Sequence, residues 1–399
     1  MKVAVEEIPG ARVEARCQHF GACGGCSIQD IAYDAQLEWK RQRLMTLMER
    51  VPAFGQVPVA IVGLTEPWRY RNKMEFTFGQ EGDELHVGLH RRGSFWKIVD
   101  IQDCLLIHPA VSQVLQTVRA AATQSRLPAY NPKTHVGFWR YLVVRCSRAT
   151  GQLMVFCITN RGERLPVDRL ASAVTKAHPE VASFWWGVTS RVADVAVPES
   201  LTCLLGEETL EEQIGHVQIR IHPLNFIQPS VEQAERIYEG IAAAAGLSGW
   251  QMVYDLYCGV GAIGMYLARR AGRVIGIESE QNNVDLAMRN VQLNRLDNMI
   301  VVAGKVEVLL TTPAFRDAPS PDLIVVDPPR AGVGKAVIGL LARLLPRRLI
   351  YVSCNPESLV QDLGALYIRT RAYRLTRVTA YDMFAHTQHM EAMVVLDRA

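Results

Sequence analysis

The sequence lacks the features that mark a membrane or secreted protein. No apolar run among its 399 residues approaches the roughly 18 residues that a membrane-spanning helix needs. Its N-terminal stretch, MKVAVEEIPG, has no apolar signal-peptide core. We therefore expect a cytoplasmic protein with no membrane partner.

Excess charge is also scarce. The 43 Lys and Arg and 40 Asp and Glu residues leave a net charge of only +3, so the whole-molecule charge does not indicate a polyanion partner. Residues 119–169 are an exception, because they hold nine Lys or Arg residues and only two acids. Aromatic residues lie between these cations, namely Tyr130, Phe138, Trp139, Tyr141 and Phe156. This mixture suits a nucleic-acid surface, and a solvated face of a β-sheet is the other interpretation.

Nine cysteines are present, an odd number that does not suit a disulfide framework in a protein expected in the cytoplasm. Cys17, Cys23 and Cys26 form C-x5-C-x2-C in the glycine-rich stretch CQHFGACGGC. Glycines at this spacing let a short loop wrap an inorganic centre. Cys104, just after a strand-like segment, is the best candidate for a fourth thiolate, and His19 is an alternative ligand.

Four thiolates suit either a [4Fe–4S] cluster or structural zinc. Zinc sites usually combine two close pairs of ligands, and the second pair is absent here. The spacing therefore favours iron–sulfur, with zinc and a metal-free loop as the alternatives.

The C-terminal half is organised around VYDLYCGVGAIGMYLARRAGRVIGIE, residues 253–278. One strand-like run ends in Asp255, a turn with Gly259 and Gly261 follows, and after a helix a second strand ends in Glu278. Glycines let the backbone approach a ligand closely, and an acid at the end of the second strand can accept hydrogen bonds from a ribose. The pattern resembles class I S-adenosylmethionine methyltransferases. A nicotinamide or flavin fold and a purely structural turn remain open.

The pattern of predicted elements divides the chain into two units. Residues 1–221 mix hairpins and helices, which predicts an α+β domain that binds RNA and holds the metal. Residues 222–399 alternate apolar strands with helices, which predicts an α/β unit with a doubly wound, mostly parallel, Rossmann-like sheet.

Ligands of such sheets bind at the carboxyl ends of the strands. Asp255, Glu278, Asp327 and Cys354 all fall at such ends, so one cleft can contain all four. Cys354 lies directly after an apolar run, whereas a structural cysteine more often lies within the strand. That position suits a nucleophile, and core packing is the alternative.

A cysteine and a methyl donor suggest a specific reaction. Carbon 5 of uracil is a poor nucleophile until a thiolate adds to carbon 6. Carbon 5 can then attack a methyl group, a base removes its proton, and the thiol leaves. Cys354, a carboxylate such as Glu391 and the glycine turn supply these parts.

Taken together, the motifs resemble the RNA 5-methyluridine (uracil-C5) methyltransferase family. They are CxxxxxCGGC, YRNK, FIQ, DLYCGVG, the strand-end Glu, DPPRAG, SCNP and HxxHxE, in the order of that family. The resemblance implies that Cys354 is the nucleophile and Glu391 the base. It further implies an S-adenosyl-L-methionine site lined by Gln228, Tyr257, Glu278 and Asp327, and a [4Fe–4S] cluster ligated by Cys17, Cys23, Cys26 and Cys104.

The sequence departs from the family pattern in two ways. Ala262 stands where the family often has Asn, which removes one polar contact to the methyl donor. Only 16 residues precede Cys17, so we expect the N-terminal β-barrel RNA-binding domain of many members to be absent. The cysteine loop resembles the 23S rRNA branch, which makes 23S rRNA the favoured RNA partner and tRNA the alternative. We expect a monomer with no obligate protein partner.

Three other functions remain as alternatives. Amino-group methylases place an aromatic residue after D/N-P-P, and RNA cytosine-C5 enzymes place a cysteine there. Arg330 occupies that position here, which argues against both. A non-catalytic iron–sulfur RNA-binding protein would be expected to lose the thiol or the base, and the sequence keeps Cys354 and Glu391.

Overall fold

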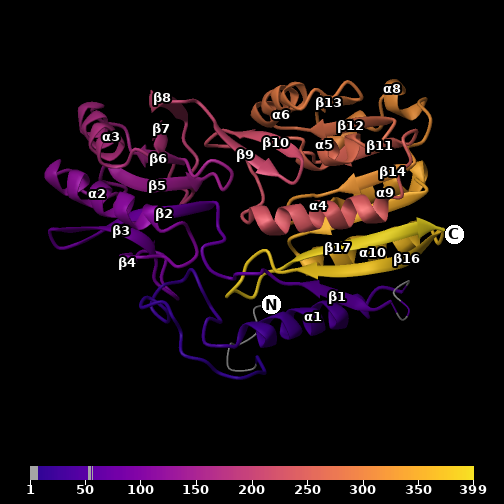
Figure 1. Ribbon diagram of the computed structural model, residues 1–399, viewed down its shortest axis with the longest axis horizontal. Helices are drawn as coiled ribbons and strands as arrows, with labels where there is room; N and C mark the ends of the chain where they lie inside the picture. Colours follow the sequence, from indigo (N-terminus) through magenta and orange to yellow (C-terminus); the bar gives the residue numbers. More distant parts are fainter. Residues whose placement is uncertain (1–7, 53–54, 56) are drawn as a thin grey trace.

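Two β-sheets organise the chain, one in each of two lobes that lie side by side (Figure 1). The structure is a computed structural model and describes residues 8–52, 55 and 57–399. The first seven residues, part of the stretch without a signal-peptide core, lie outside the described residues. No described helix is long and apolar enough to cross a membrane.

The C-terminal lobe contains an eight-stranded sheet with the order β1-β16-β17-β15-β14-β11-β12-β13. The five strands from β15 to β13 are parallel, whereas β17 runs antiparallel to both of its neighbours. The expected α/β class with a mostly parallel sheet is therefore confirmed. The strands are β1 (Val59–Val62), β11 (Met252–Leu256), β12 (Arg273–Glu278), β13 (Met299–Ala303), β14 (Leu323–Val326), β15 (Arg348–Ser353), β16 (Tyr373–Tyr381) and β17 (Glu391–Arg398).

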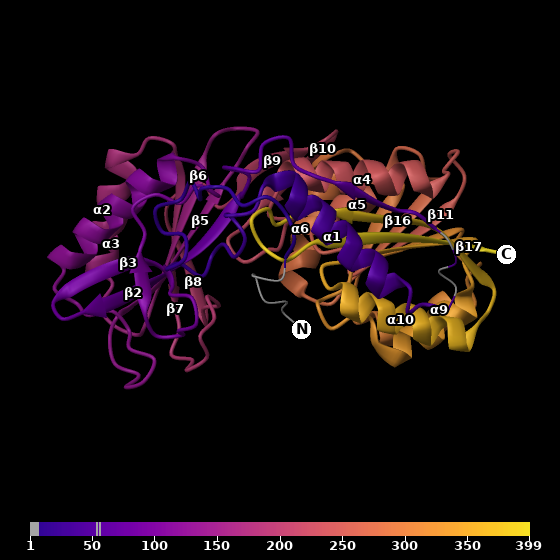
Figure 2. The same cartoon turned by 90° about the horizontal axis from the view of Figure 1, so that it is seen from below.

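Helices cover both faces of this sheet (Figure 2). In β14, Leu323 and Val325 face one core cluster and Ile324 and Val326 face the other, as the two-residue period of a strand requires. All four side chains are buried, which explains the uninterrupted apolar run in the sequence. The first face is covered by α4 (Val231–Ala245), α5 (Ala262–Ala268) and α6 (Gln281–Leu293), and the second by α1 (Tyr33–Met48), α7 (Val306–Leu309), α9 (Gly334–Leu344) and α10 (Pro356–Arg369). The short α8 (Pro313–Arg316) follows α7.

The N-terminal lobe contains a seven-stranded sheet with the order β4-β3-β2-β5-β6-β7-β8. Its neighbouring strands are antiparallel except for β6 and β7, which α3 connects. Helices α2 and α3 cover one face. The elements are β2 (Lys73–Glu81), β3 (Glu84–His90), β4 (Ile98–Asp100), α2 (Ala110–Gln124), β5 (Trp139–Cys146), β6 (Leu153–Thr159), α3 (Leu165–Ala177), β7 (Val181–Val188) and β8 (Ser200–Gly206).

The other face of this sheet packs against the C-terminal lobe. Val143, Met154 and Phe156 belong to the same buried cluster as the hairpin of β9 (Leu210–Ile214) and β10 (Val217–Ile221) and the helices α4 and α5. The two lobes therefore share one apolar core, and side chains from both can be held in fixed positions at their junction.

The first part of the chain contributes to both lobes, contrary to the predicted boundary at residue 221. Strand β1 pairs in parallel with β16, with Val59 opposite Val378, at the edge of the C-terminal sheet. Helix α1 packs on the same lobe through Leu44 and Met48. The assignment of residues 1–221 to one unit is thus wrong for this segment, because β1 adds to a strand that lies more than 300 residues later in the sequence and leaves no local signal.

Candidate active site

The glycine turn between β11 and α5 has the backbone conformation that the sequence indicates. Tyr257, Gly259 and Gly261 have φ angles of 63°, 54° and 83°, which glycine adopts readily and other residues rarely do. A Cβ added at Gly259 would meet no atom within 4 Å. The turn therefore leaves open space beside its backbone. Tyr257 adopts the left-handed backbone conformation although it is not glycine, and its ring packs against the core.

Glu278 lies at the end of β12, beside this turn. Its Oε2 accepts a hydrogen bond from the backbone N–H of Gly259 at 3.0 Å, and its Oε1 accepts bonds from the N–H groups of Ser279 and Glu280 at 2.7 and 2.8 Å. These bonds fix a carboxylate at the carboxyl edge of the sheet. Each oxygen keeps acceptor capacity for a ligand hydroxyl.

Asp255, near the end of β11, is bonded to the helix that follows the turn. Its Oδ2 accepts a bond from the N–H of Gly264 at 2.8 Å, and the side chain is fully buried. Burial raises the pKa of Asp255 to about 7. Of the four residues predicted at strand ends, Asp255 is thus the one that faces the protein interior.

Asp327 follows β14 and is held by a residue from the segment before α4. The Nε2 of Gln228 donates to the Oδ2 of Asp327 at 3.4 Å. Asn72 in turn donates from Nδ2 to the backbone carbonyl of Gln228 at 2.8 Å, and its backbone N–H donates to the carbonyl of Pro229 at 2.9 Å. The buried Asn72 of the YRNK run therefore positions the segment that carries Gln228, a role that the sequence analysis missed.

Cys354 follows β15 and lines a wide cleft of about 820 Å³ at the junction of the two lobes. The cleft combines segments that are far apart in the sequence, among them the cysteine loop, α1, the DPPRAG turn and the segment before β17. Four arginines line it, namely Arg43, Arg71, Arg92 and Arg330. Cys354 is partly exposed there, which favours the nucleophile interpretation over core packing.

Glu391 begins β17 and is only 2% exposed. Burial and the charge of Asp327 raise its pKa well above the ordinary value, whereas Arg330 lowers it. Burial together with the charges of Glu391 and Asp327 also raises the pKa of Cys354 to about 11, again opposed by Arg330. The thiol and the two carboxyl groups therefore act on one another electrostatically, and the protonated forms are favoured until a cation or a ligand arrives.

Helix α1 holds the loop before Glu391 through polar side chains on one of its faces. Lys40 is fully buried and pairs with Asp382, which also accepts a bond from the hydroxyl of Tyr33 at 2.8 Å. Gln36 bonds with the ring and backbone of His386 at 3.3 and 3.1 Å.

Further along the helix, Arg43 donates to the carbonyl of Gln388 at 3.0 Å and to Glu357 at 2.6 Å. The positions of Tyr33, Gln36, Lys40 and Arg43 repeat at helical spacing. Such a repeat of polar residues is the signal that could have revealed this contact.

The four predicted metal ligands meet in one small cavity. Cys17, Cys23, Cys26 and Cys104 all line it, and the space between them is about 20 Å³. The backbone N–H of Gly25 donates to the sulfur of Cys23, and Gln29 donates to the sulfur of Cys26, both at 3.3 Å.

Burial raises the pKa of Cys26 to about 12 and that of Cys104 to about 11. Cys26 and Cys104 thus stay protonated unless a metal replaces their protons. Within the described part of the chain, no group of three or more Cys, His, Asp or Glu side chains is arranged to hold a metal ion. His19 lines the same cavity, but its Nε2 accepts a bond from the backbone of Gln102 at 3.1 Å.

The cationic stretch 119–169 does not form one continuous surface, because its β5 segment is buried. Arg140 and Arg145 are 1% and 2% exposed, and every residue of β5 is buried because the strand lies inside the sheet with packed layers on both faces. The solvated-face interpretation fails here for the same reason. Phe138, Trp139, Tyr141 and Phe156 are core residues, and exposed cations of this stretch, such as Arg148 and Arg161, lie outside the arginine-lined cleft.

Comparisons with known proteins agree with this arrangement. A family model described as tRNA (uracil-5-)-methyltransferase matches residues 206–399. An uncharacterized RNA methyltransferase of Nitratidesulfovibrio vulgaris is 38% identical over 95% of this chain and 82% of its own. One from Caldanaerobacter subterraneus is 35% identical, over 100% and 88%.

A solved structure resembles the whole chain. The crystal structure of Pyrococcus abyssi tRNA (uracil-54, C5)-methyltransferase in complex with S-adenosyl-L-homocysteine superposes with a TM-score of 0.78 at 28% identity, covering 97% of this chain and 85% of that one. The chain is an RNA methyltransferase, and it belongs to the RNA (uracil-5-)-methyltransferase family.

Proposed function

We propose that this protein methylates carbon 5 of a uridine in RNA, with S-adenosyl-L-methionine as methyl donor and Cys354 as nucleophile. The observation that carries the proposal is the junction of the lobes, where a strand-end thiol and a buried carboxyl group act on one another beside an arginine-lined cleft. Amino-methylation needs no thiol, and Arg330 occupies the position after D-P-P at which the cytosine-C5 interpretation expects a cysteine.

The residues at the glycine turn suit the methyl donor. Open space beside Gly259 admits an adenosyl group, and the fixed carboxylate of Glu278 can accept both ribose hydroxyls. The pair formed by Gln228 and Asp327 lies at the neighbouring strand end, where it can face the amino-acid part of the donor. Tyr257 shapes the turn between them. When bound, S-adenosyl-L-methionine supplies an electrophilic methyl group on a cationic sulfur.

The chain's own residues perform the remaining steps. The Cys354 thiolate adds to carbon 6 of uracil, which turns carbon 5 into a nucleophile. After methylation, Glu391 accepts the proton from carbon 5, and the electron pair of that bond expels the thiolate. A buried carboxyl group with a raised pKa is suited to this proton transfer. The positive charge of Arg330 favours both the thiolate and the carboxylate.

We also propose that the cysteine cavity binds a [4Fe–4S] cluster. Four thiols and two N–H···S bonds converge there, which is the donor set that such a cluster uses. Cys17, Cys23, Cys26 and Cys104 would hold the cluster through their thiolates. The cluster would stabilise the fold, because methyl transfer needs no electron transfer to or from a metal.

The cleft selects RNA through charge and shape. Arg43, Arg71, Arg92 and Arg330 surround Cys354 and suit the phosphates of a folded RNA with one base turned toward the thiol. The solved relative is a tRNA (uracil-54, C5)-methyltransferase, and the matching family is that of tRNA (uracil-5-)-methyltransferases. These comparisons favour tRNA over the 23S rRNA that the cysteine loop suggested.

The proposal is tested with unmodified tRNA and 23S rRNA transcripts that carry tritium at carbon 5 of uridine. Wild-type protein and the donor should release tritium into water from one transcript, and Cys354→Ala should release none. Binding of S-adenosyl-L-homocysteine by both proteins controls for folding. If protein that binds S-adenosyl-L-homocysteine released no tritium from either RNA, this result would count against uracil-C5 chemistry.

A further inference from the structure

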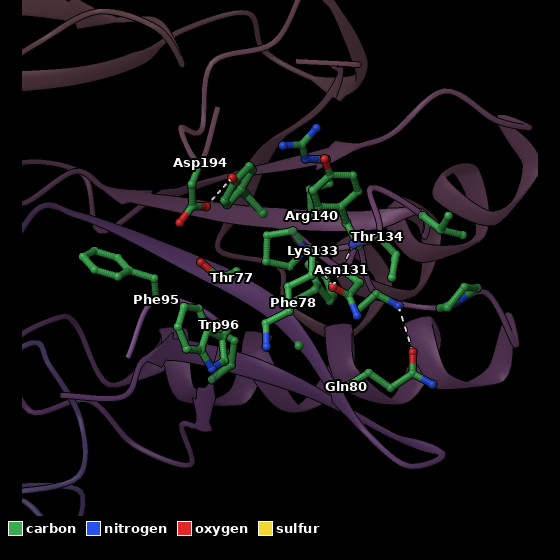
Figure 3. A pocket seen from close by; sticks show the side chains of 18 of the residues that line it. Thr77, Phe78, Gln80, Phe95, Trp96, Asn131, Lys133, Thr134, Arg140 and Asp194 are labelled. Atoms are coloured by element: carbon green, nitrogen blue, oxygen red, sulfur yellow. Dashed lines mark hydrogen bonds between the residues drawn. The ribbon is translucent and has the colours of Figure 1, made fainter. Parts of the chain in front are cut away.

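A second pocket, in the N-terminal lobe, is separate from the catalytic cleft (Figure 3). It has a volume of about 440 Å³, within the usual range for small-ligand sites. Strand β2, the loop between β3 and β4, and residues 128–136 form its walls. None of the residues assigned above to catalysis, to the methyl donor or to the cluster lines it.

Two exposed aromatic side chains stand on one side of this pocket (Figure 3). Phe95 and Trp96 are 79% and 57% exposed. The two ends of their loop are joined by a hydrogen bond from the N–H of Arg91 to the carbonyl of Lys97 at 2.8 Å. The ammonium group of Lys133 lies 4.5 Å from the centre of the Trp96 ring. Flat rings that remain in water beside a cation offer a stacking surface for a base.

The inner wall of the pocket offers hydrogen-bonding groups in fixed positions. The carboxylate of Asp194 accepts the Tyr141 hydroxyl at 2.6 Å and lies 3.6 Å from the Nε2 of His90. Arg140 stacks on the ring of Tyr130 at 3.9 Å and donates to the carbonyl of Arg191 at 2.7 Å.

The loop between β3 and β4 connects this pocket with the catalytic cleft. Arg92, at its start, lines the cleft and donates to the carbonyl of Cys26 at 2.7 Å. Phe95 and Trp96, three and four residues later, line the second pocket. An RNA strand that contacts Arg92 in the cleft is therefore close to the aromatic pair.

From this arrangement we propose that the second pocket binds an unpaired nucleotide of the same RNA whose target uridine enters the catalytic cleft. Its base stacks on Phe95 and Trp96, the polar groups of the wall contact its edge, and Lys133 supports its phosphate. The inference rests on the proposed function only in taking RNA as the substrate.

The test removes the stacking surface and leaves the wall intact. We would compare wild-type protein, the double variant Phe95→Ala/Trp96→Ala, and Trp250→Ala, which removes a tryptophan that is 66% exposed elsewhere. Affinity for the tritiated transcripts would be measured by filter binding. Since stacking on aromatic side chains contributes strongly to the binding of each base, we expect the double variant to bind about tenfold more weakly and Trp250→Ala to bind as wild type does.

Ultraviolet crosslinking of the full-length protein to the same transcripts provides an independent readout. Mass spectrometry should find RNA attached to the peptide that contains Phe95 and Trp96. Unchanged affinity of the double variant, or crosslinks confined to the cleft peptides, would overturn the proposal. Tritium release is measured in parallel, so that pocket-dependent RNA binding without release would refute the uracil chemistry and still support the pocket.

Discussion

The buried pair of Lys40 and Asp382 should be essential for the position of the loop that leads to Glu391. Both side chains are fully buried, and Lys40 also donates to the carbonyl of Phe384 at 3.1 Å. Lys40→Met would leave the carboxylate of Asp382 in the interior with the Tyr33 hydroxyl as its one remaining side-chain partner among the described residues. Removing one member of a buried pair costs about 3–5 kcal/mol, so we expect a loss of stability of that size.

Arg41→Met is a matched control, because Arg41 neighbours Lys40 on the same helix and pairs with Glu38 at the surface. An exposed pair of this kind contributes little to stability, because water screens its charges. Midpoints of chemical unfolding would be compared for both variants. The double variant Lys40→Met/Asp382→Asn should lose less stability than the two single changes together, since it leaves no unpaired charge. Equal midpoints for Lys40→Met and Arg41→Met would refute the reasoning.

Three further results are expected. Burial and two carboxyl groups raise the pKa of Cys354 to about 11. Alkylation of Cys354 by iodoacetamide in the free protein should therefore accelerate about tenfold per pH unit from neutral pH upward. A labelling rate that reaches a plateau below pH 8 would contradict this. Asn72→Ala removes the hydrogen bond to the carbonyl of Gln228. It should weaken the binding of S-adenosyl-L-homocysteine, measured by calorimetry, about tenfold, and unchanged affinity would contradict this role. Protein purified without oxygen should contain about four iron atoms per chain, which Cys104→Ser should lose and Cys203→Ser should keep; iron-free wild-type protein would refute the cluster.

The sequence was sufficient to predict the parallel part of the C-terminal sheet. Each buried strand appears as a short apolar run, and Glu278, Asp327 and Cys354 directly mark the ends of three of them. Because the carboxyl ends of parallel strands share one edge, their placement on one side of the sheet follows from the pattern alone. Cys17, Cys23, Cys26 and Cys104 were likewise expected together, and they line one cavity.

Contacts between distant segments could not be predicted in the same way. Lys40 lies beside Arg41 in the sequence, and a lysine there is ordinarily solvated. It is nevertheless fully buried, because Asp382, 342 residues later, supplies the compensating charge. The pairing of β1 with β16 is equally non-local. Composition also misleads where a strand is covered on both faces, as Arg140 and Arg145 demonstrate: their guanidinium groups bond to backbone carbonyls in the interior.

The arginine-lined cleft depends on all of these contacts at once. Arg43 comes from α1, Arg71 and Arg92 from the N-terminal lobe, and Arg330 from the turn after β14. None of the four belongs to the cationic stretch that composition selected. A sequence can reveal the chemistry of single motifs, whereas the surface that surrounds them arises only when the lobes pack together.

The most direct test of the account is to trap the covalent RNA adduct. Glu391→Gln should add its thiol to uracil and pass through methylation, but it cannot remove the proton from carbon 5, so protein and RNA should remain joined on a denaturing gel. Mass spectrometry should locate the bond at Cys354 and the nucleotide at a methylated uridine, and the double variant Glu391→Gln/Cys354→Ala should form no adduct. Normal turnover by Glu391→Gln without an adduct, or an adduct at another cysteine, would contradict the assignment of nucleophile and base.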